Sequence, residues 1–173
     1  MMSNCDLPVA DRSLDARVAV AVRGAASRPL AELNARLLLA EDTPDIRRLV
    51  SEILKKQGAE VVAVENGERA VAVALEAANR GEPFDVVLMD IQMPVLDGLE
   101  ATRRLRNRNY SGPIVALTAH AMTDDRTQCL QAGCDDYETK PVDRERLAEL
   151  VARHIRRHRG KPGRGPATKT DLS

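Results

Sequence analysis

The stretch that decides the fold is Ala35–Gly58, ARLLLAEDTPDIRRLVSEILKKQG. Its first six residues form an apolar run that stops at Glu41-Asp42, which is typical of a fully buried strand. Thr43-Pro44 then indicates a helix start, with a capping hydroxyl and a proline at the first helical position. Apolar residues at offsets 0, 3, 4, 7 and 8 from Ile46 give this helix one apolar face. The stretch therefore predicts a strand, a tight loop and an amphipathic helix that ends at Gly58.

The same unit recurs along the chain. Further strands are expected at 61–64, 84–89, 114–117 and 136–139. Helices are expected from 67 to about 79, around 99–105, over 123–132 and around 147–155. Strands that alternate with helices favour a parallel sheet with right-handed crossovers. The sequence thus predicts an α/β fold with a five-stranded, doubly wound parallel sheet, although its periodicity does not give the strand order.

Charge divides the chain although its 26 basic and 26 acidic residues balance. Residues 35–151 carry 15 basic and 21 acidic groups, a net −6, whereas residues 152–173 carry seven basic and one acidic, a net +6. We expect a poorly ordered leader or linker over 1–34 and a folded domain over 35–157. The Gly- and Pro-rich end predicts a disordered basic tail over 158–173.

Composition excludes several classes of protein. No apolar run approaches the ~20 residues of a membrane span, and the first residues lack the pattern of a secretory signal. The three cysteines form no CxxC pair, which suits a reducing compartment. Only Phe84, Tyr110 and Tyr137 are aromatic, which argues against a base-stacking nucleic-acid surface. We expect a cytoplasmic protein with neither a membrane nor a nucleic acid as partner.

Side chains that suit phosphate and metal chemistry follow four of the five expected strands. Glu41 and Asp42 follow the first strand, Asp90 the third, Thr118 the fourth and Lys140 the fifth. Because ligands bind at the carboxyl ends of the strands in such sheets, these side chains should share one edge. Two like charges ~4 Å apart repel by about 4 kcal/mol at an effective dielectric constant near 20, so three carboxylates favour a bound cation. Oxygen donors with no His or Cys beside them favour Mg²⁺.

A metal ion, a carboxylate, a lysine and a hydroxyl together indicate phosphoryl transfer. We expect Asp90 to be the nucleophile and to form an acyl phosphate. Mg²⁺ and Lys140 would neutralise the phosphoryl oxygens, and Thr118 would donate a hydrogen bond. Each residue alone would pass as an ordinary residue at a strand end, so the prediction rests on the set.

Four runs of sequence resemble the receiver domain of two-component response regulators: LLLAEDTPDIRRLV, DVVLMDIQMPVLDG, IVALTAHAM and AGCDDYETKP. The resemblance covers about 35–155, with spacings of 48 residues from Asp42 to Asp90, 28 to Thr118 and 22 to Lys140. The last two runs are most similar to receivers attached to hybrid sensor histidine kinases. The resemblance implies a flavodoxin-like (βα)5 fold with strand order 2-1-3-4-5.

The resemblance also implies roles for the acidic residues. Asp90 would be the phosphorylated residue and would take its phosphoryl group from a phosphohistidine. Asp42 would bind Mg²⁺ directly and Glu41 through water. The backbone carbonyl of Gln92 would complete the protein ligands.

Other roles concern signalling and the lifetime of the phosphoryl group. Thr118 would move toward the phosphoryl group and Tyr137 would swing inward, which couples the site to the face of the fourth helix, fifth strand and fifth helix. The Lys140-Pro141 bond is expected to be cis. Gln92 and His120 would line the route of the water that hydrolyses the acyl phosphate, although a solvated loop histidine fits His120 equally well.

The implied function is a phosphorelay receiver, not a stand-alone enzyme, because the chain has no room for histidine kinase domains. Its partners would be a histidine kinase or histidine phosphotransfer protein and a downstream protein that binds the phosphorylated face. One alternative is a receiver fragment of a hybrid kinase that acts as a passive protein-binding module. An aspartate-nucleophile phosphatase of the haloacid dehalogenase type is disfavoured, because it needs a second Asp where Gln92 stands.

Overall fold

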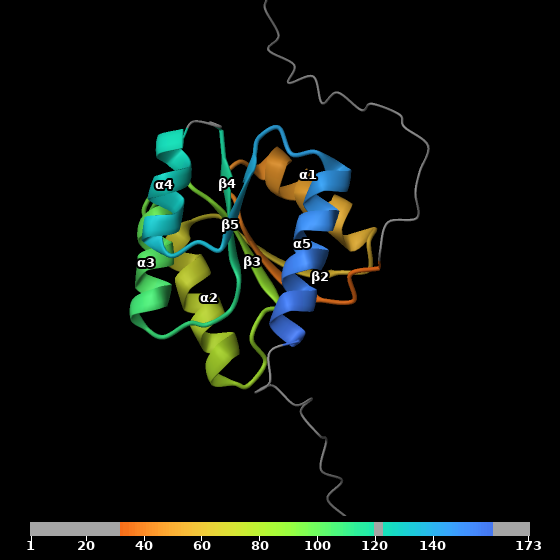
Figure 1. Cartoon of the computed structure of the whole chain (residues 1–173), viewed down its shortest axis with the longest axis horizontal. Helices are drawn as coiled ribbons and strands as arrows, with labels where there is room; N and C mark the ends of the chain where they lie inside the picture. Colours follow the sequence, from red (N-terminus) through yellow and green to blue (C-terminus); the bar gives the residue numbers. More distant parts are fainter. Residues whose placement is uncertain (1–31, 120–122, 161–173) are drawn as a thin grey trace, which may run out of the picture.

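The structure, a computed structural model, describes residues 32–119 and 123–160. Strands and helices alternate along this part of the chain (Figure 1). The strands are β1 (Arg36–Ala40), β2 (Glu60–Val64), β3 (Val86–Asp90), β4 (Ile114–Thr118) and β5 (Asp136–Thr139). The helices are α1 (Pro44–Lys55), α2 (Gly67–Asn79), α3 (Gly98–Asn107), α4 (Thr123–Ala132) and α5 (Arg144–Arg159).

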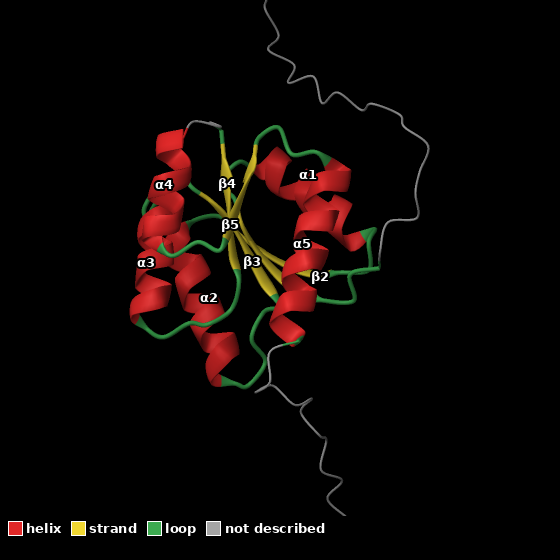
Figure 2. Ribbon diagram, viewed as in Figure 1, coloured by secondary structure: helices red, strands yellow, loops and turns green. Residues whose placement is uncertain are grey.

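The five strands form one parallel sheet in the order β2-β1-β3-β4-β5. Helices α1 and α5 cover one face, and α2, α3 and α4 cover the other (Figure 2). This arrangement confirms the predicted doubly wound, flavodoxin-like fold. Because β1 lies between β2 and β3, the chain reverses its direction of winding at the carboxyl ends of β1 and β3, where such folds bind ligands.

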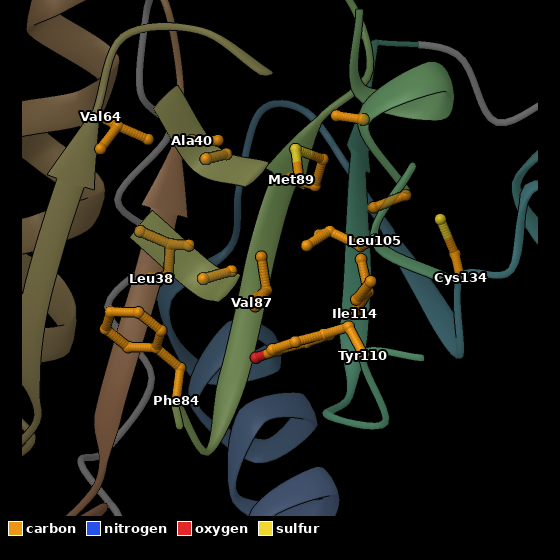
Figure 3. Packing of buried hydrophobic residues seen from close by; sticks show 14 of the residues in the cluster. Leu38, Ala40, Val64, Phe84, Val87, Met89, Leu105, Tyr110, Ile114 and Cys134 are labelled. Atoms are coloured by element: carbon orange, nitrogen blue, oxygen red, sulfur yellow. The ribbon is translucent and has the colours of Figure 1, made fainter. Parts of the chain in front are cut away.

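Alternate side chains of each strand point to opposite faces of the sheet, so the buried apolar residues form two layers. Each layer packs the helices of its side against the sheet. Leu38 and Ala40 of β1 pack toward α2 and α3, together with Phe84 and Met89 (Figure 3). Leu37 and Leu39 belong to the second layer, under α1 and α5. The central strands are buried on both faces, and this explains why their sequences read as continuous apolar runs.

The strand boundaries lie within two residues of the expected ones, whereas α1 ends at Lys55, before Gly58, and α5 extends beyond 147–155 at both ends. Strand β3 begins at Val86, two residues later than expected, and includes Asp90 as its last residue. Helix α1 begins at Pro44, but the side chain of the N-cap residue, Thr43, makes no capping hydrogen bond. Thr43 is thus the N-cap residue, as predicted, but the expectation that its hydroxyl would cap the helix was wrong. Gly58 and Gly133 have the positive φ values, 83° and 102°, that favour glycine after a helix.

The packed region extends further than expected at both ends. Leu33 is buried in the layer under α1 and α5, and its N–H donates to the carbonyl of Gln57. Helix α5 continues to Arg159, whose guanidinium pairs with Asp85 and donates to the carbonyl of Asn34. The rest of the predicted leader (1–31) and of the predicted tail (161–173) lies outside the described residues. Within the described residues, the helices are all too short or too polar to cross a membrane.

Candidate functional site

The predicted site residues gather at the carboxyl edge of the sheet because the strands are parallel and in register. Asp90 is the last residue of β3 and Thr118 the last of β4, while Glu41-Asp42 directly follow β1. Lys140 directly follows β5, and its N–H donates to the Thr118 carbonyl. Carboxylate oxygens of Glu41, Asp42 and Asp90 lie within 4.8 Å of one another. The side chain of Thr118 is buried at the same edge.

Lys140 lies in the acidic cluster itself. Its Nζ is 2.7 Å from Oε2 of Glu41 and 2.7 Å from Oδ2 of Asp90. The ammonium therefore bridges two carboxylates directly. Burial disfavours the charged amine, yet its hydrogen bonds to Asp90 and Glu41 outweigh burial and raise the pKa of Lys140. The Lys140-Pro141 bond is cis, as predicted.

Glu41 is the most deeply buried acid of the cluster. Its side chain has no solvent exposure, and burial raises the pKa of its carboxyl group despite the hydrogen bond to Lys140. Its Oε1 accepts the N–H of Thr43, so the carboxylate is held from both sides. Asp42, in contrast, is half-buried and reaches solvent. This difference fits the predicted division between a direct metal ligand and a more remote one.

Asp90 is 3% exposed and is held by two contacts. Oδ2 pairs with Lys140, and Oδ1 accepts the N–H of Gln92 at 3.1 Å. Gly98, at the start of α3, packs so closely on β3 that a Cβ there would lie 2.0 Å from the Asp90 carbonyl oxygen. Only glycine permits this approach, which fixes the loop that follows Asp90.

The residues fit a magnesium ion by their chemistry. Carboxylate oxygens, with no sulfur or imidazole among the described cluster residues, are the ligands that Mg²⁺ prefers. Asp42 gives the cluster an opening to solvent, from which Mg²⁺ could retain several of its waters. The role of the Gln92 carbonyl as a further ligand stays a prediction, as does the water-mediated role of Glu41.

Of the predicted switch residues, Thr118 ends β4 at the edge that carries the cluster, and Tyr137 lies on the adjacent strand β5. Thr118 is buried, whereas the ring of Tyr137 is half-buried and packs against the layer under α2, α3 and α4. The guanidinium of Arg126, on α4, lies over this ring, 5.8 Å from its centroid. His120, the remaining predicted residue, lies outside the described residues.

Sequence reasoning missed Arg47, on the first turn of α1. Its Nη1 donates to the carbonyls of Glu41 at 2.7 Å and Asp42 at 3.1 Å. No sequence signal distinguishes it from Arg48, the next residue, which instead pairs with Glu52 at the surface. Only the path of the loop before α1 decides which of the two arginines faces the site.

Comparison with known proteins places the chain in a family. A family model described as the response regulator receiver domain matches residues 37–152. Sensor protein GacS of Pseudomonas syringae pv. syringae is 46% identical over 136 residues, which cover 76% of this chain and 14% of GacS. The chain thus spans only a small part of that relative. Sensor and hybrid histidine kinases are both among the relatives, as the residues of the last two motifs predict.

Solved receiver structures have the same fold. The receiver domain of sensor histidine kinase PA1611 from Pseudomonas aeruginosa PAO1, with a magnesium ion in its active-site cleft, is 39% identical with a TM-score of 0.62. The match covers 70% of this chain and 97% of that one. A co-crystal structure of Saccharomyces cerevisiae Ypd1, a histidine phosphotransfer protein, with the receiver domain of Ssk1 matches at 29% identity and a TM-score of 0.61. That match covers 67% of this chain and 85% of the other. The chain belongs to the receiver domain family of two-component response regulators.

Proposed function

We propose that the chain is a phosphorelay receiver that accepts a phosphoryl group on Asp90 in a Mg²⁺-dependent reaction in the cytoplasm. The observation that carries the proposal is the position of the Lys140 ammonium, 2.7 Å from both Glu41 and Asp90. A lysine held there by two carboxylates is ready to contact an oxygen of a phosphoryl group on Asp90. The Mg²⁺-bound PA1611 receiver supports the choice of metal.

The transfer is a displacement at phosphorus. A carboxylate oxygen of Asp90 forms the new O–P bond while the N–P bond of a phosphohistidine breaks, and the electron pair returns to the imidazole nitrogen. A bound Mg²⁺ would supply charge neutralisation at the phosphoryl oxygens. Lys140 stabilises the same negative charge, Thr118 donates a hydrogen bond, and the N–H of Gln92 orients the Asp90 carboxylate. Glu41, Asp42 and the Gln92 carbonyl would hold the metal.

The phosphorylated site signals through the surface of α4, β5 and α5. Thr118 and Tyr137 lie on adjacent strands, and β4 and β5 pair through Thr118 and Thr139. A shift of Thr118 toward the phosphoryl group would vacate space into which the half-buried ring of Tyr137 turns. That movement would separate the ring from Arg126 and change the surface that a downstream protein binds.

The expected phosphodonor is a histidine kinase or a histidine phosphotransfer protein. The similarity to the Ssk1 receiver, which is bound to Ypd1 in its co-crystal structure, supports this choice. Gln92 and His120 would set the lifetime of the acyl phosphate, because both are expected beside the route of the attacking water.

A phosphorylation assay tests the proposal directly. The chain is incubated with Mg²⁺ and acetyl phosphate, and its intact mass is measured beside Asp90→Asn and Asp45→Asn variants. Asp45 is an exposed acid in the first turn of α1 and serves as the matched control. We expect a labile gain of one phosphoryl group in the parent chain and in Asp45→Asn. We expect no gain in Asp90→Asn or in EDTA.

The alternative, a passive binding module, predicts a different result. The folded parent chain would then gain no mass with acetyl phosphate or with a phosphorylated histidine phosphotransfer protein. A gain that survives the Asp90→Asn change would instead show that another residue is modified. Either outcome overturns the proposed chemistry.

A further inference from the structure

Arg47 contacts three consecutive carbonyl groups in the loop that carries the metal-binding acids. Its backbone N–H donates to the Thr43 carbonyl at 2.9 Å. Its Nη1 donates to the Glu41 and Asp42 carbonyls at 2.7 and 3.1 Å. The first of these bonds is the ordinary backbone bond of a helix start, which any residue would make. The guanidinium itself fixes the peptide groups that follow Glu41 and Asp42, and these peptides set the directions in which the two acidic side chains leave the backbone.

Among the described residues, Arg47 is the one whose side chain donates to the Glu41 and Asp42 carbonyls. The side chain of Thr43 makes no capping bond, and its hydroxyl instead donates to Oδ1 of Asp42 at 3.4 Å. The Glu41 carboxylate restrains the loop from inside the site through the N–H of Thr43. Arg47, half-buried on the first turn of α1, restrains it from outside. The guanidinium can satisfy two acceptors at once, which a lysine ammonium does with less geometric definition.

We propose that Arg47 is a positioning residue for the metal site: its guanidinium holds the Glu41–Asp42 backbone so that both carboxylates face Asp90. This inference rests on the proposed Mg²⁺-dependent function and deepens it. The physical basis is that hydrogen bonds to the groups around metal ligands fix the geometry of the ligands. Removing such a contact typically weakens metal binding by about 10- to 100-fold.

The sign of the effect separates positioning from simple electrostatics. A cation on the loop repels Mg²⁺, so if Arg47 acted only through its charge, its removal would strengthen metal binding. If Arg47 acts by holding the carbonyls, its removal weakens metal binding. Arg47→Lys retains the charge but loses the guanidinium geometry, so it should also weaken binding, by less than Arg47→Ala.

The experiment measures metal binding without phosphorylation. Mn²⁺, whose ligand preferences resemble those of Mg²⁺ and whose free form is counted by electron paramagnetic resonance, is titrated into the full chain, and Mg²⁺ competition gives the Mg²⁺ affinity. Parent, Arg47→Ala, Arg47→Lys and Arg48→Ala chains are compared. Arg48 is the matched control, because it lies on the same helix turn and pairs only with Glu52 at the surface.

We expect the Mg²⁺ dissociation constant to rise on the order of tenfold in Arg47→Ala, to rise less in Arg47→Lys and to stay unchanged in Arg48→Ala. Circular dichroism and thermal unfolding in EDTA establish that each variant is folded at the assay temperature. If Arg47→Ala does not fold, Arg47→Lys alone decides the question. Unchanged or tighter binding in the folded Arg47 variants overturns the inference. If the parent chain itself binds no metal, the proposed function fails instead.

Discussion

At the scale of single residues, the site places several ionisable side chains in positions that are buried from solvent. Glu41 is fully buried and Asp90 nearly so, yet both contact one lysine. Buried carboxylates are costly unless they are paired and hydrogen-bonded, and here Lys140 and two backbone N–H groups meet that need. These contacts hold the Asp90 carboxylate in a fixed orientation.

Val95 is a residue whose conformation costs stability. It lies in the loop between β3 and α3 with a φ of 70°, and its side chain is 77% exposed. A β-branched residue is strained at positive φ, and an exposed side chain recovers little energy from packing. We expect Val95→Gly to raise the free energy of unfolding by about 1 kcal/mol, because relief of strain exceeds the extra freedom of glycine in the unfolded chain.

Urea-induced unfolding in EDTA measures this difference. Val95→Ala is the control, because alanine keeps a Cβ and should recover only part of the gain. A Val95→Gly chain that is less stable than the parent would show that the Val95 side chain contributes packing that its exposure does not indicate.

At the scale of elements, ion pairs join β5 to α5. Asp136 and Glu138 lie on the same side of β5 and pair with basic residues of α5. Asp136 contacts Arg153 and His154. A carboxylate oxygen of Glu138 lies 3.6 Å from Arg146. Tyr137, between them, packs toward the opposite layer. Strand β5 is therefore joined to α5 by ion pairs, while on the α4 side the guanidinium of Arg126 lies over the ring of Tyr137.

The Asp136 pairs should give the fold a specific pH dependence. Burial alone would raise the pKa of Asp136, but the hydrogen bond from His154, the backbone N–H of Tyr137 and the charge of Arg153 together lower it below 3.8. The carboxyl group stays ionised to lower pH in the folded protein than in the unfolded chain. Its contribution is therefore fully present above pH 3.8 and disappears as the pH falls through the lowered pKa.

Asp136→Asn should destabilise the chain by about 1 kcal/mol at pH 7, and this deficit should shrink as the pH falls below 3.8. Denaturant unfolding from pH 7 to pH 3 tests it. Glu149→Gln, a change at an exposed acid of α5, should show no such trend. A deficit that is constant across this range would mean that the carboxylate charge of Asp136 contributes nothing to stability.

At the scale of the whole molecule, the acidic cluster should lower the stability of the metal-free fold. Three carboxylates meet within 4.8 Å, and among these three described acids Lys140 bridges Glu41 and Asp90 but not Asp42. Asp42 therefore repels Glu41 and Asp90 in the metal-free chain. A bound Mg²⁺ would relieve this repulsion, and a ligand that binds only the folded state stabilises the fold.

Asp42→Asn should accordingly raise the free energy of unfolding in EDTA, by on the order of 1 kcal/mol, and should abolish the stabilisation by Mg²⁺. Thermal unfolding with and without Mg²⁺, at constant ionic strength, measures both effects. Asp45→Asn, at the exposed acid of α1, should leave the response to Mg²⁺ intact. Equal Mg²⁺ stabilisation in the parent and Asp42→Asn chains would remove Asp42 from the metal site.

The sequence by itself determined most of the architecture. Periodicity is a local property, so the apolar runs and helical stripes predicted five strands and five helices, and α4 and β5 have the predicted boundaries. Parallel strands align their carboxyl ends at one edge of the sheet. The residues that follow four of the five strands therefore predicted the acidic cluster and its lysine. The resemblance to receivers supplied the strand order 2-1-3-4-5, which the sheet confirms.

Only the tertiary structure decided where individual side chains find their partners. Arg47 and Arg48 are identical in type and adjacent on one helix, yet one holds the acidic loop and the other faces solvent. Lys140 reaches Glu41 from 99 residues away, and Arg159 reaches Asn34 from 125. A long flexible side chain can meet any acceptor within its reach, and the acceptors within reach are set by how distant segments pack, which no local pattern in the sequence records.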